Sequence, residues 1–119
     1  MALLRLYLAG PMTGYPAFNY PAFFAAAQTL RDAGYAVINP ASIGLHADWA
    51  YADYLRVSLR LMLNSGQGVA VLPRWDASRG AQTEVQVARA LGWPVHTVAE
   101  WQALAASGTL AEYLAVHSH

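Results

Sequence analysis

The sequence predicts a three-layer α/β domain in which helices cover both faces of a parallel β-sheet. Four short runs typical of β-strands alternate with longer segments of helical periodicity, and this alternation is typical of βαβ units. Right-handed crossovers between parallel strands place helices on both faces. The 119 residues suit one domain with one core, and no linker or internal repeat interrupts them, so 1–119 is assigned to a single domain.

The four expected strands are short, apolar and bounded by residues that end strands. They are 4–9 (LRLYLA), 35–38 (YAVI), 69–72 (VAVL) and 94–98 (PVHTV). The breakers, turns or helix starts that follow them are Gly10-Pro11, Asn39-Pro40, Pro73 and Ala99-Glu100. A sheet of at least four parallel strands is therefore expected.

Apolar residues at helical spacing predict helices in the segments between and after these strands. The expected ranges are 21–33, 49–63, 80–92 and 97–117, the last as one or two short helices broken near Ser107-Gly108. The side chains expected to face the core are Phe23, Ala26, Ala27 and Leu30 in the first helix, Leu55, Leu59, Met62 and Leu63 in the second, and Val85, Ala88 and Leu91 in the third.

Composition excludes several classes of protein. Hydrophobic residues make up 56% of the chain and charged residues only 12%, about half the ~25% usual for soluble domains, which excludes a disordered chain. The formal net charge of zero argues against a nucleic-acid polymer as a partner. With no cysteine, a disulfide scaffold, a thiolate nucleophile and a cysteine zinc site are excluded.

Hydropathy and charge also predict where the protein acts and with what. No apolar run approaches the ~18 residues of a membrane span, and Arg5 interrupts the N-terminal apolar stretch too early for a signal peptide, so a cytoplasmic protein without a membrane partner is expected. The histidines are scattered, so we expect no metal and no cofactor. So little charge leaves apolar surface uncovered, which predicts a homo-oligomer, most simply a two-fold dimer.

Two loops have the composition of a ligand site, and both follow strands whose carboxyl ends would meet at one sheet edge. The first, 7–14 (YLAGPMTG), contains Gly10 and Gly14, which allow a close approach of the backbone to a ligand, and it begins with Tyr7 near the end of the strand. Its spacing is not that of a dinucleotide fingerprint, and no Walker lysine follows. An ordinary Gly-Pro turn explains it equally well.

The second loop, 75–84 (WDASRGAQTE), leads into the third expected helix. Ser78 and Arg79 bring a hydroxyl and a guanidinium to a helix N-terminus, which favours an anion. Glu84 lies about one turn into the helix, toward the same sheet edge. Two purely structural interpretations stay open: Ser78 as the N-cap, and Glu84 as an acid that stabilises the helix dipole.

Together these stretches resemble the nucleoside 2-deoxyribosyltransferase-like superfamily. The YLAGPM run at 7–12 is similar to its first-strand motif, and S-x-G-x-x-x-E at 78–84 is similar to its nucleophile helix. A group of small proteins within the superfamily has G-P-M-T-G, N-(Y/F)-P-A-F and G-W-x-x-S-x-G-A-x-x-E, which here align with 10–14, 19–23 and 74–84. The resemblance covers about residues 4–98 and implies a Rossmann-like (flavodoxin-like) sheet of four to five strands.

The resemblance also implies roles for single residues. Glu84 matches the family's nucleophilic glutamate, Tyr7 matches the tyrosine beside it, and Gly10 lines the sugar pocket. At the position of Ser78 the transferases usually have an acid that contacts the sugar, whereas the nucleotide N-hydrolases have a serine that contacts the 5′-phosphate. The implied activity is therefore cleavage of the N-glycosidic bond of a nucleoside 5′-monophosphate, ribose or 2-deoxyribose, by a glutamate nucleophile.

The expected site thus has catalytic and substrate-binding members. Tyr7 and Glu84 are the expected catalytic residues. The expected substrate-binding residues are Gly10, Pro11, Met12, Trp75, Ser78, Arg79 and Gly80, of which the last three would bind the phosphate. Trp75, Tyr15 and Phe18 are candidates to stack on the base. In the family a neighbouring subunit commonly completes the pocket, which would bring Tyr113 or the C-terminal segment to a partner's site.

The second expected helix departs from the family pattern. The family often has an acid in R-x-D-L, and this register reads Arg56-Val57-Ser58-Leu59 here. Because this acid is missing, no residue is assigned to protonate the leaving base. Alternative functions therefore stay open: a nucleotide-binding sensor without turnover, a nucleoside deoxyribosyltransferase, or an interaction domain that acts through its apolar surface.

Overall fold

In the computed structural model, which describes residues 3–108, four parallel strands form one sheet in the order β2-β1-β3-β4. The strands are β1 (Arg5–Ala9), β2 (Ala36–Ile38), β3 (Gly68–Val71) and β4 (Val95–Thr97). Tyr7 of β1 pairs with Ile38 on one side and with Val69 on the other. The expected parallel α/β sheet is confirmed, with four strands in the described part of the chain.

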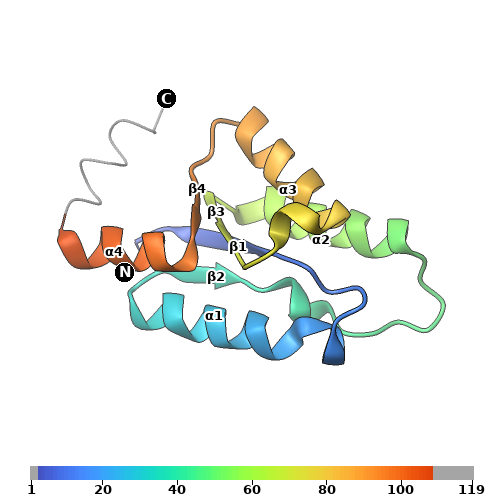
Figure 1. The fold of residues 1–119 in the computed structure, drawn as a ribbon. Helices are drawn as coiled ribbons and strands as arrows, with labels where there is room; N and C mark the ends of the chain where they lie inside the picture. Colours follow the sequence, from blue (N-terminus) through green and yellow to red (C-terminus); the bar gives the residue numbers. More distant parts are fainter. Residues whose placement is uncertain (1–2, 109–119) are drawn as a thin grey trace.

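Helices cover both faces of this sheet (Figure 1). The four α-helices are α1 (Tyr20–Asp32), α2 (Tyr51–Ser65), α3 (Arg79–Ala90) and α4 (Val98–Ser107). Helices α1 and α4 pack on one face, and α2 and α3 pack on the other. Three short 3-10 turns join them to the strands: η1 (Pro16–Asn19), η2 (Pro40–Ile43) and η3 (Trp75–Ala77).

The alternation of side chains along β1 creates two apolar cores. Leu6 and Leu8 point to the α1 face, whereas Tyr7 and Ala9 point to the α2 and α3 face. All four are fully buried, as expected for the central strand of a parallel sheet covered on both sides. Tyr7 therefore brings a hydroxyl into a largely apolar layer.

Trp101 holds α4 against the sheet. Its indole N–H donates a hydrogen bond of 2.9 Å to the carbonyl of Val69 in β3, and its own carbonyl accepts one of 2.6 Å from the Tyr35 hydroxyl. The Tyr35 and Trp101 rings meet edge to face at 5.5 Å. These contacts satisfy the polar groups of two buried aromatic residues.

The strand order places a topological switch point between β1 and β3. The chain passes from β1 to β2 through α1, and it returns across β1 to β3 through α2 on the opposite face. The loops after β1 and β3 therefore diverge to opposite faces, and a crevice opens at the carboxyl ends of these two strands.

Two side chains expected in the core are exposed. Leu63 is 49% exposed, because the buried positions of α2 are Ser58 and Met62, and Leu63 lies about 100° around the helix from Met62. Leu91 is 51% exposed, because α3 ends at Ala90 and Leu91 is its C-cap. The prediction that both face the core is wrong.

A helix does end at the break expected near Ser107-Gly108. Helix α4 ends at Ser107, and Gly108 follows it in the left-handed conformation with φ 73°. The rest of the expected range 97–117, Tyr113 included, lies outside the described residues.

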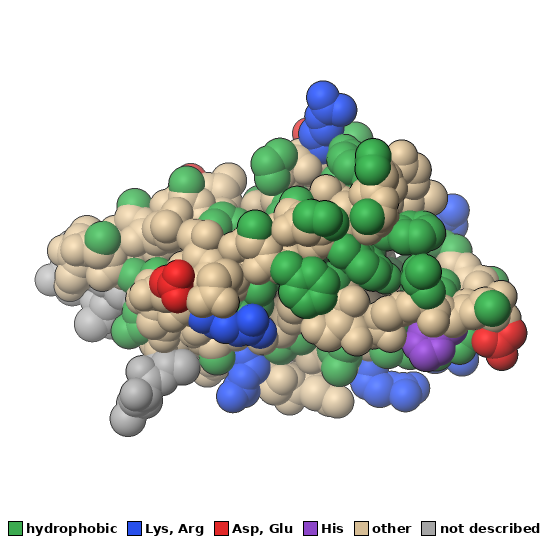
Figure 2. Space-filling view, turned by 90° about the horizontal axis from the view of Figure 1, so that it is seen from below, with side chains coloured by type: hydrophobic (Ala, Val, Ile, Leu, Met, Phe, Trp, Pro, Cys, Tyr) green, Lys and Arg blue, Asp and Glu red, His purple; other side chains and the backbone are tan. Residues whose placement is uncertain are grey.

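The surface reflects the low charge content of the chain. Apolar side chains gather in the middle of the face on which α1 lies, while charged side chains lie mostly toward its edges (Figure 2). Phe24 of α1 and Leu45 are examples of exposed large apolar residues. Among the described residues, no helix has the length and apolar content needed to cross a membrane.

The neighbours Met62 and Leu63 provide a matched test of how α2 packs. Met62→Ala removes a fully buried side chain and should lower the free energy of unfolding by about 2–5 kcal/mol. Leu63→Ala removes a half-exposed one and should change it by about 0.5 kcal/mol or less. Urea unfolding of both variants gives the comparison, and equal losses would contradict the observed rotation of α2.

Candidate functional site

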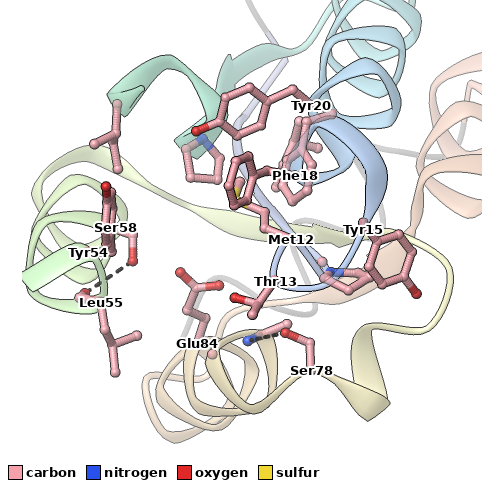
Figure 3. A pocket seen from close by; sticks show the side chains of 18 of the residues that line it. Met12, Thr13, Tyr15, Phe18, Tyr20, Tyr54, Leu55, Ser58, Ser78 and Glu84 are labelled. Atoms are coloured by element: carbon pink, nitrogen blue, oxygen red, sulfur yellow. Dashed lines mark hydrogen bonds between the residues drawn. The ribbon is translucent and has the colours of Figure 1, made fainter. Parts of the chain in front are cut away.

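A cavity of about 640 Å³ occupies the switch point. Residues from five parts of the chain line it: the end of β1 with its loop, the η1 region with the start of α1, the loop after β2, helix α2, and the start of α3. Figure 3 shows Glu84 pointing into this space, with Thr13 and Ser78 on one side of it and Ser58 and Tyr54 on the other.

The base of the cavity is formed by a buried carboxylate and a buried phenol. Glu84, in the second turn of α3, is only 6% exposed, and Tyr7 is fully buried. The Tyr7 hydroxyl donates a hydrogen bond to Oε2 of Glu84. The alternation of β1 explains the pair, because it turns Tyr7 toward the sheet face on which α3 lies.

Burial controls the protonation of this pair. It raises the pKa of Glu84 to about 7, against the lowering effect of the hydrogen bonds with Tyr7 and Ser58. Burial, followed by the charge of Glu84, raises the pKa of Tyr7 well above its usual value. Tyr7 therefore stays a neutral donor, while Glu84 changes charge near neutral pH.

Ser58 is a third buried polar residue at the same place. It lies on the inward face of α2, where its hydroxyl donates a hydrogen bond of 3.1 Å to the carbonyl of Leu55. Hydrogen bonding with Ser58 also lowers the pKa of both Tyr7 and Glu84. Sequence reasoning noted this position only as the register of the family's acid and did not assign it to the site. Ser58 lies four residues before Met62, which was expected to face the core, so helical spacing could have placed Ser58 on the same inward face.

The N-terminus of α3 forms the polar end of the cavity. Ser78 is the N-cap, and its Oγ accepts a hydrogen bond of 3.3 Å from the amide of Ala81. The first amides of a helix have no acceptor within the helix, so those of Arg79 and Gly80 are available to a ligand. A Cβ on Gly80 would come within 3.3 Å of the Tyr51 hydroxyl, and glycine therefore keeps this approach open. The Arg79 guanidinium lies 4.9 Å from the centre of the Tyr51 ring.

One wall of the cavity is aromatic and is built on an unusual turn. Ala17, Phe18 and Asn19 all have left-handed backbone, with φ values of 51°, 53° and 61°. Such conformations are unfavourable for residues with a Cβ, and the Asn19 amide supports the turn with a hydrogen bond of 2.9 Å to the carbonyl of Pro11. The turn brings Phe18 to the cavity, 44% exposed and 6.0 Å from the Tyr20 ring.

The loop after β2 completes the cavity from the opposite side. The Tyr54 hydroxyl accepts a hydrogen bond of 2.7 Å from the His46 amide and donates one of 3.0 Å to the His46 carbonyl. The His46 ring stacks on Trp49 at 3.8 Å. These contacts hold the loop whose Leu45 lines the cavity. Sequence reasoning missed this loop, although it follows a third strand that ends at the same sheet edge.

Most residues expected in the site do line the cavity. They are Tyr7, Gly10, Pro11, Met12, Ser78, Arg79, Gly80 and Glu84, together with the two candidate stacking residues Tyr15 and Phe18. Trp75 is not among them. It packs against the α2 and α3 core, with the Arg89 guanidinium 5.7 Å from its ring, and it lines a separate depression next to α4.

The raised pKa of Glu84 predicts a specific dependence of stability on pH. Between pH 4.5 and about 7 the folded protein holds a proton at Glu84 that the unfolded chain releases, so this group's contribution to stability falls as pH rises through that window. Glu84→Gln removes the contribution. The loss of unfolding free energy from pH 5 to pH 8 should therefore be smaller in the variant by about 2–3 kcal/mol.

Chemical denaturation at the two pH values measures this difference. Asp32→Asn is the matched control, since it neutralises an exposed carboxylate at the end of α1 and keeps an acceptor for Gln28. Equal pH dependence in Glu84→Gln and the unmodified protein would show that Glu84 titrates as an ordinary surface acid.

The chain was also compared with known proteins. A family profile described as a domain of unknown function (DUF4406) matches residues 4–97, which include every element from β1 to β4 and all the residues that line the cavity. The search of curated proteins finds no significant match. Because the profile covers well over half of its length, the chain belongs to the DUF4406 family.

Proposed function

We propose that the protein is an N-glycosidase that removes the base from a ribo- or 2′-deoxyribonucleoside 5′-monophosphate, with Glu84 as the nucleophile. The observation that carries this proposal is the Glu84 carboxylate, buried at the base of an aromatic cavity and held there by the Tyr7 hydroxyl. A carboxylate in such a place can stabilise the positive charge that develops on the sugar during glycosidic cleavage.

The chemistry proceeds in two steps on the anomeric carbon, C1′. Ionised Glu84 attacks C1′ as the bond to the base breaks, and a covalent glycosyl-enzyme forms through an oxocarbenium-like transition state. Water then attacks C1′ and releases Glu84; its hydroxyl group stays on the sugar 5-phosphate, and its proton balances the one that the departing base takes up. Tyr7 positions the carboxylate, and its raised pKa keeps it a proton donor to Glu84 throughout.

The cavity accommodates such a substrate with the phosphate at the start of α3. Ser78 precedes Glu84 by six residues, which is roughly 9 Å along a helix and leaves room for a sugar between phosphate and carboxylate. The open amides of Arg79 and Gly80 and the positive end of the helix dipole favour the phosphate. The base then lies among the aromatic side chains beyond Glu84.

A nucleotide-binding protein without turnover is the second candidate. The presence of Ser58, a hydroxyl rather than a carboxylic acid, opposite Glu84 favours it, because hydroxyls are poor donors of a proton to a leaving base. A deoxyribosyltransferase would use the same intermediate, with a second base in place of water. The expected cytoplasmic homo-oligomer stays a prediction.

Base release separates these candidates. The purified protein is incubated with a panel of purine, pyrimidine and base-alkylated nucleoside 5′-monophosphates, and free base is measured chromatographically. Glu84→Gln should lower base release by at least about 1,000-fold, because it removes the nucleophile. Glu100→Gln should retain activity, since Glu100 is exposed on α4 and glutamine can keep its capping contact with Thr97.

The same assay has a pH signature and a clear negative outcome. Only ionised Glu84 can attack, so kcat/KM should rise with pH up to about 7 and then level off. Thermal stabilisation by nucleotides without base release would instead identify a binding protein. Release only in the presence of a second free base would identify a transferase.

Ser78→Asp tests the position of the phosphate. Aspartate is a good N-cap, so α3 should still form, but its charge repels a phosphate. Nucleotide binding should weaken by about 10- to 100-fold, while binding of the corresponding nucleoside should change little. Ser78→Asn is the uncharged control. Calorimetry measures the affinity of each of the three proteins for both ligands, and equal affinity of the unmodified protein for nucleotide and nucleoside would place the phosphate elsewhere.

A further inference from the structure

The charges around the cavity have a definite polarity. The ionisable side chains that line it in the described part of the chain are one carboxylate, one guanidinium and several tyrosines. Glu84 lies deep inside, whereas Arg79 is exposed beside the amides that begin α3. This arrangement complements a ligand that carries an anion at one end and a cation at the other.

The aromatic wall of the cavity has surfaces of the kind that bind organic cations. Phe18 and Tyr20 lie 6.0 Å apart, and the Tyr54 hydroxyl is close enough to Tyr20 to raise its pKa, an effect smaller than that of burial. Figure 3 shows Tyr54 across Glu84 from Ser78, with Phe18 and Tyr20 farther from Ser78 than Thr13 is, so these three rings lie away from the phosphate end. Faces of neutral aromatic rings attract a flat cation, and a nearby carboxylate adds to that attraction.

The proton donors in the cavity also favour a ligand with a cationic base. A neutral base needs a proton as it leaves, but the Tyr7 hydroxyl already donates to Glu84 and that of Tyr54 donates to His46. Phenols have pKa values near 10 and are weak general acids at neutral pH. A base that is already a cation needs no proton, because it takes the electron pair of the breaking bond and leaves neutral.

We propose, on the basis of the function proposed above, that the substrate is a nucleoside 5′-monophosphate whose heteroaromatic base carries a fixed positive charge. A pyridinium nucleotide and an N7-alkylated purine nucleotide are members of this class. Glu84 forms a bond to C1′ while the bond from C1′ to the ring nitrogen breaks, and the electron pair of that bond neutralises the ring. Water then replaces Glu84 on C1′, and the net products are the neutral base, the sugar 5-phosphate and one proton.

A cationic base also offsets the burial of Glu84. Burial favours the protonated carboxyl, which cannot attack C1′, whereas a positive ring beside it favours the ionised form. The same contact that binds the base thus prepares the nucleophile.

Two matched pairs of compounds test the proposal. Nicotinamide mononucleotide is compared with its reduced dihydro form, and N7-methylguanosine 5′-monophosphate is compared with guanosine 5′-monophosphate. The members of each pair have nearly the same shape and differ in the charge of the base. The expected result is a kcat/KM at least about 100-fold higher for both cationic members. Equal or faster release from the neutral members would overturn this inference and leave the glycosidase proposal intact.

Binding measurements decide the matter if no compound is cleaved. In that case the glycosidase proposal fails, and calorimetry on the same pairs tests the charge preference alone. Tighter binding of the cationic members by about 3- to 30-fold would support the inference. Equal binding within each pair would overturn it.

A pair of variants tests whether the aromatic wall recognises the charge. Phe18→Leu keeps an apolar side chain in the cavity but removes the ring, and it should raise KM, or Kd where there is no turnover, for the cationic nucleotides by about 3- to 30-fold. The affinity for the neutral members should change less. Phe24→Leu is the control, because Phe24 is exposed on α1 and does not line the cavity. Equal losses for charged and neutral members in Phe18→Leu would contradict recognition of the charge by this ring.

Discussion

The hydrogen bond from Tyr7 to Glu84 is the interaction on which the site depends. It joins the central strand to α3 inside a largely apolar layer in which Ser58 is the third buried polar side chain, so the loss of either partner would remove a hydrogen bond from the other where few replacements are at hand. A buried carboxylate is unfavourable in its charged form, which explains why its pKa lies near 7 rather than near 4.5. Strained or unfavourable groups of this kind are typical of functional sites.

The rest of the architecture makes that arrangement possible. The strand order β2-β1-β3-β4 separates the loops after β1 and β3, and this separation opens the cavity directly over Tyr7. Ser78 is the N-cap of α3, which begins near the carboxyl edge of the sheet. The second turn of this helix therefore brings Glu84 next to Tyr7 of β1. The core on the opposite face, where Trp101 joins α4 to β3, contributes no side chain to the ionisable pair and packs against the other side of the sheet.

Half of the residues that line the cavity lie in loops and short 3-10 turns. The left-handed turn at 17–19 and the loop held by Tyr54 contribute aromatic and aliphatic side chains from opposite sides. Both segments satisfy their polar groups locally, through Asn19 in one case and His46 in the other. Strand β1 and helix α3 thus supply the buried pair, while loops shape the space around it, which is how parallel sheets commonly divide these roles.

The amino-acid sequence by itself determined the order of strands and helices, because apolar periodicity and breakers such as Gly10-Pro11 are local signals. It also predicted the two segments, at the end of β1 and at the start of α3, that carry Tyr7 and Glu84, since strand ends mark the edge where ligands bind. Helical spacing also predicted the buried face of α1, but only the tertiary structure decided the rotation of α2, which exposed Leu63 and brought Ser58 to the cavity. It also turned Trp75 away and brought in Tyr54, because contacts between distant segments depend on packing that no local pattern encodes.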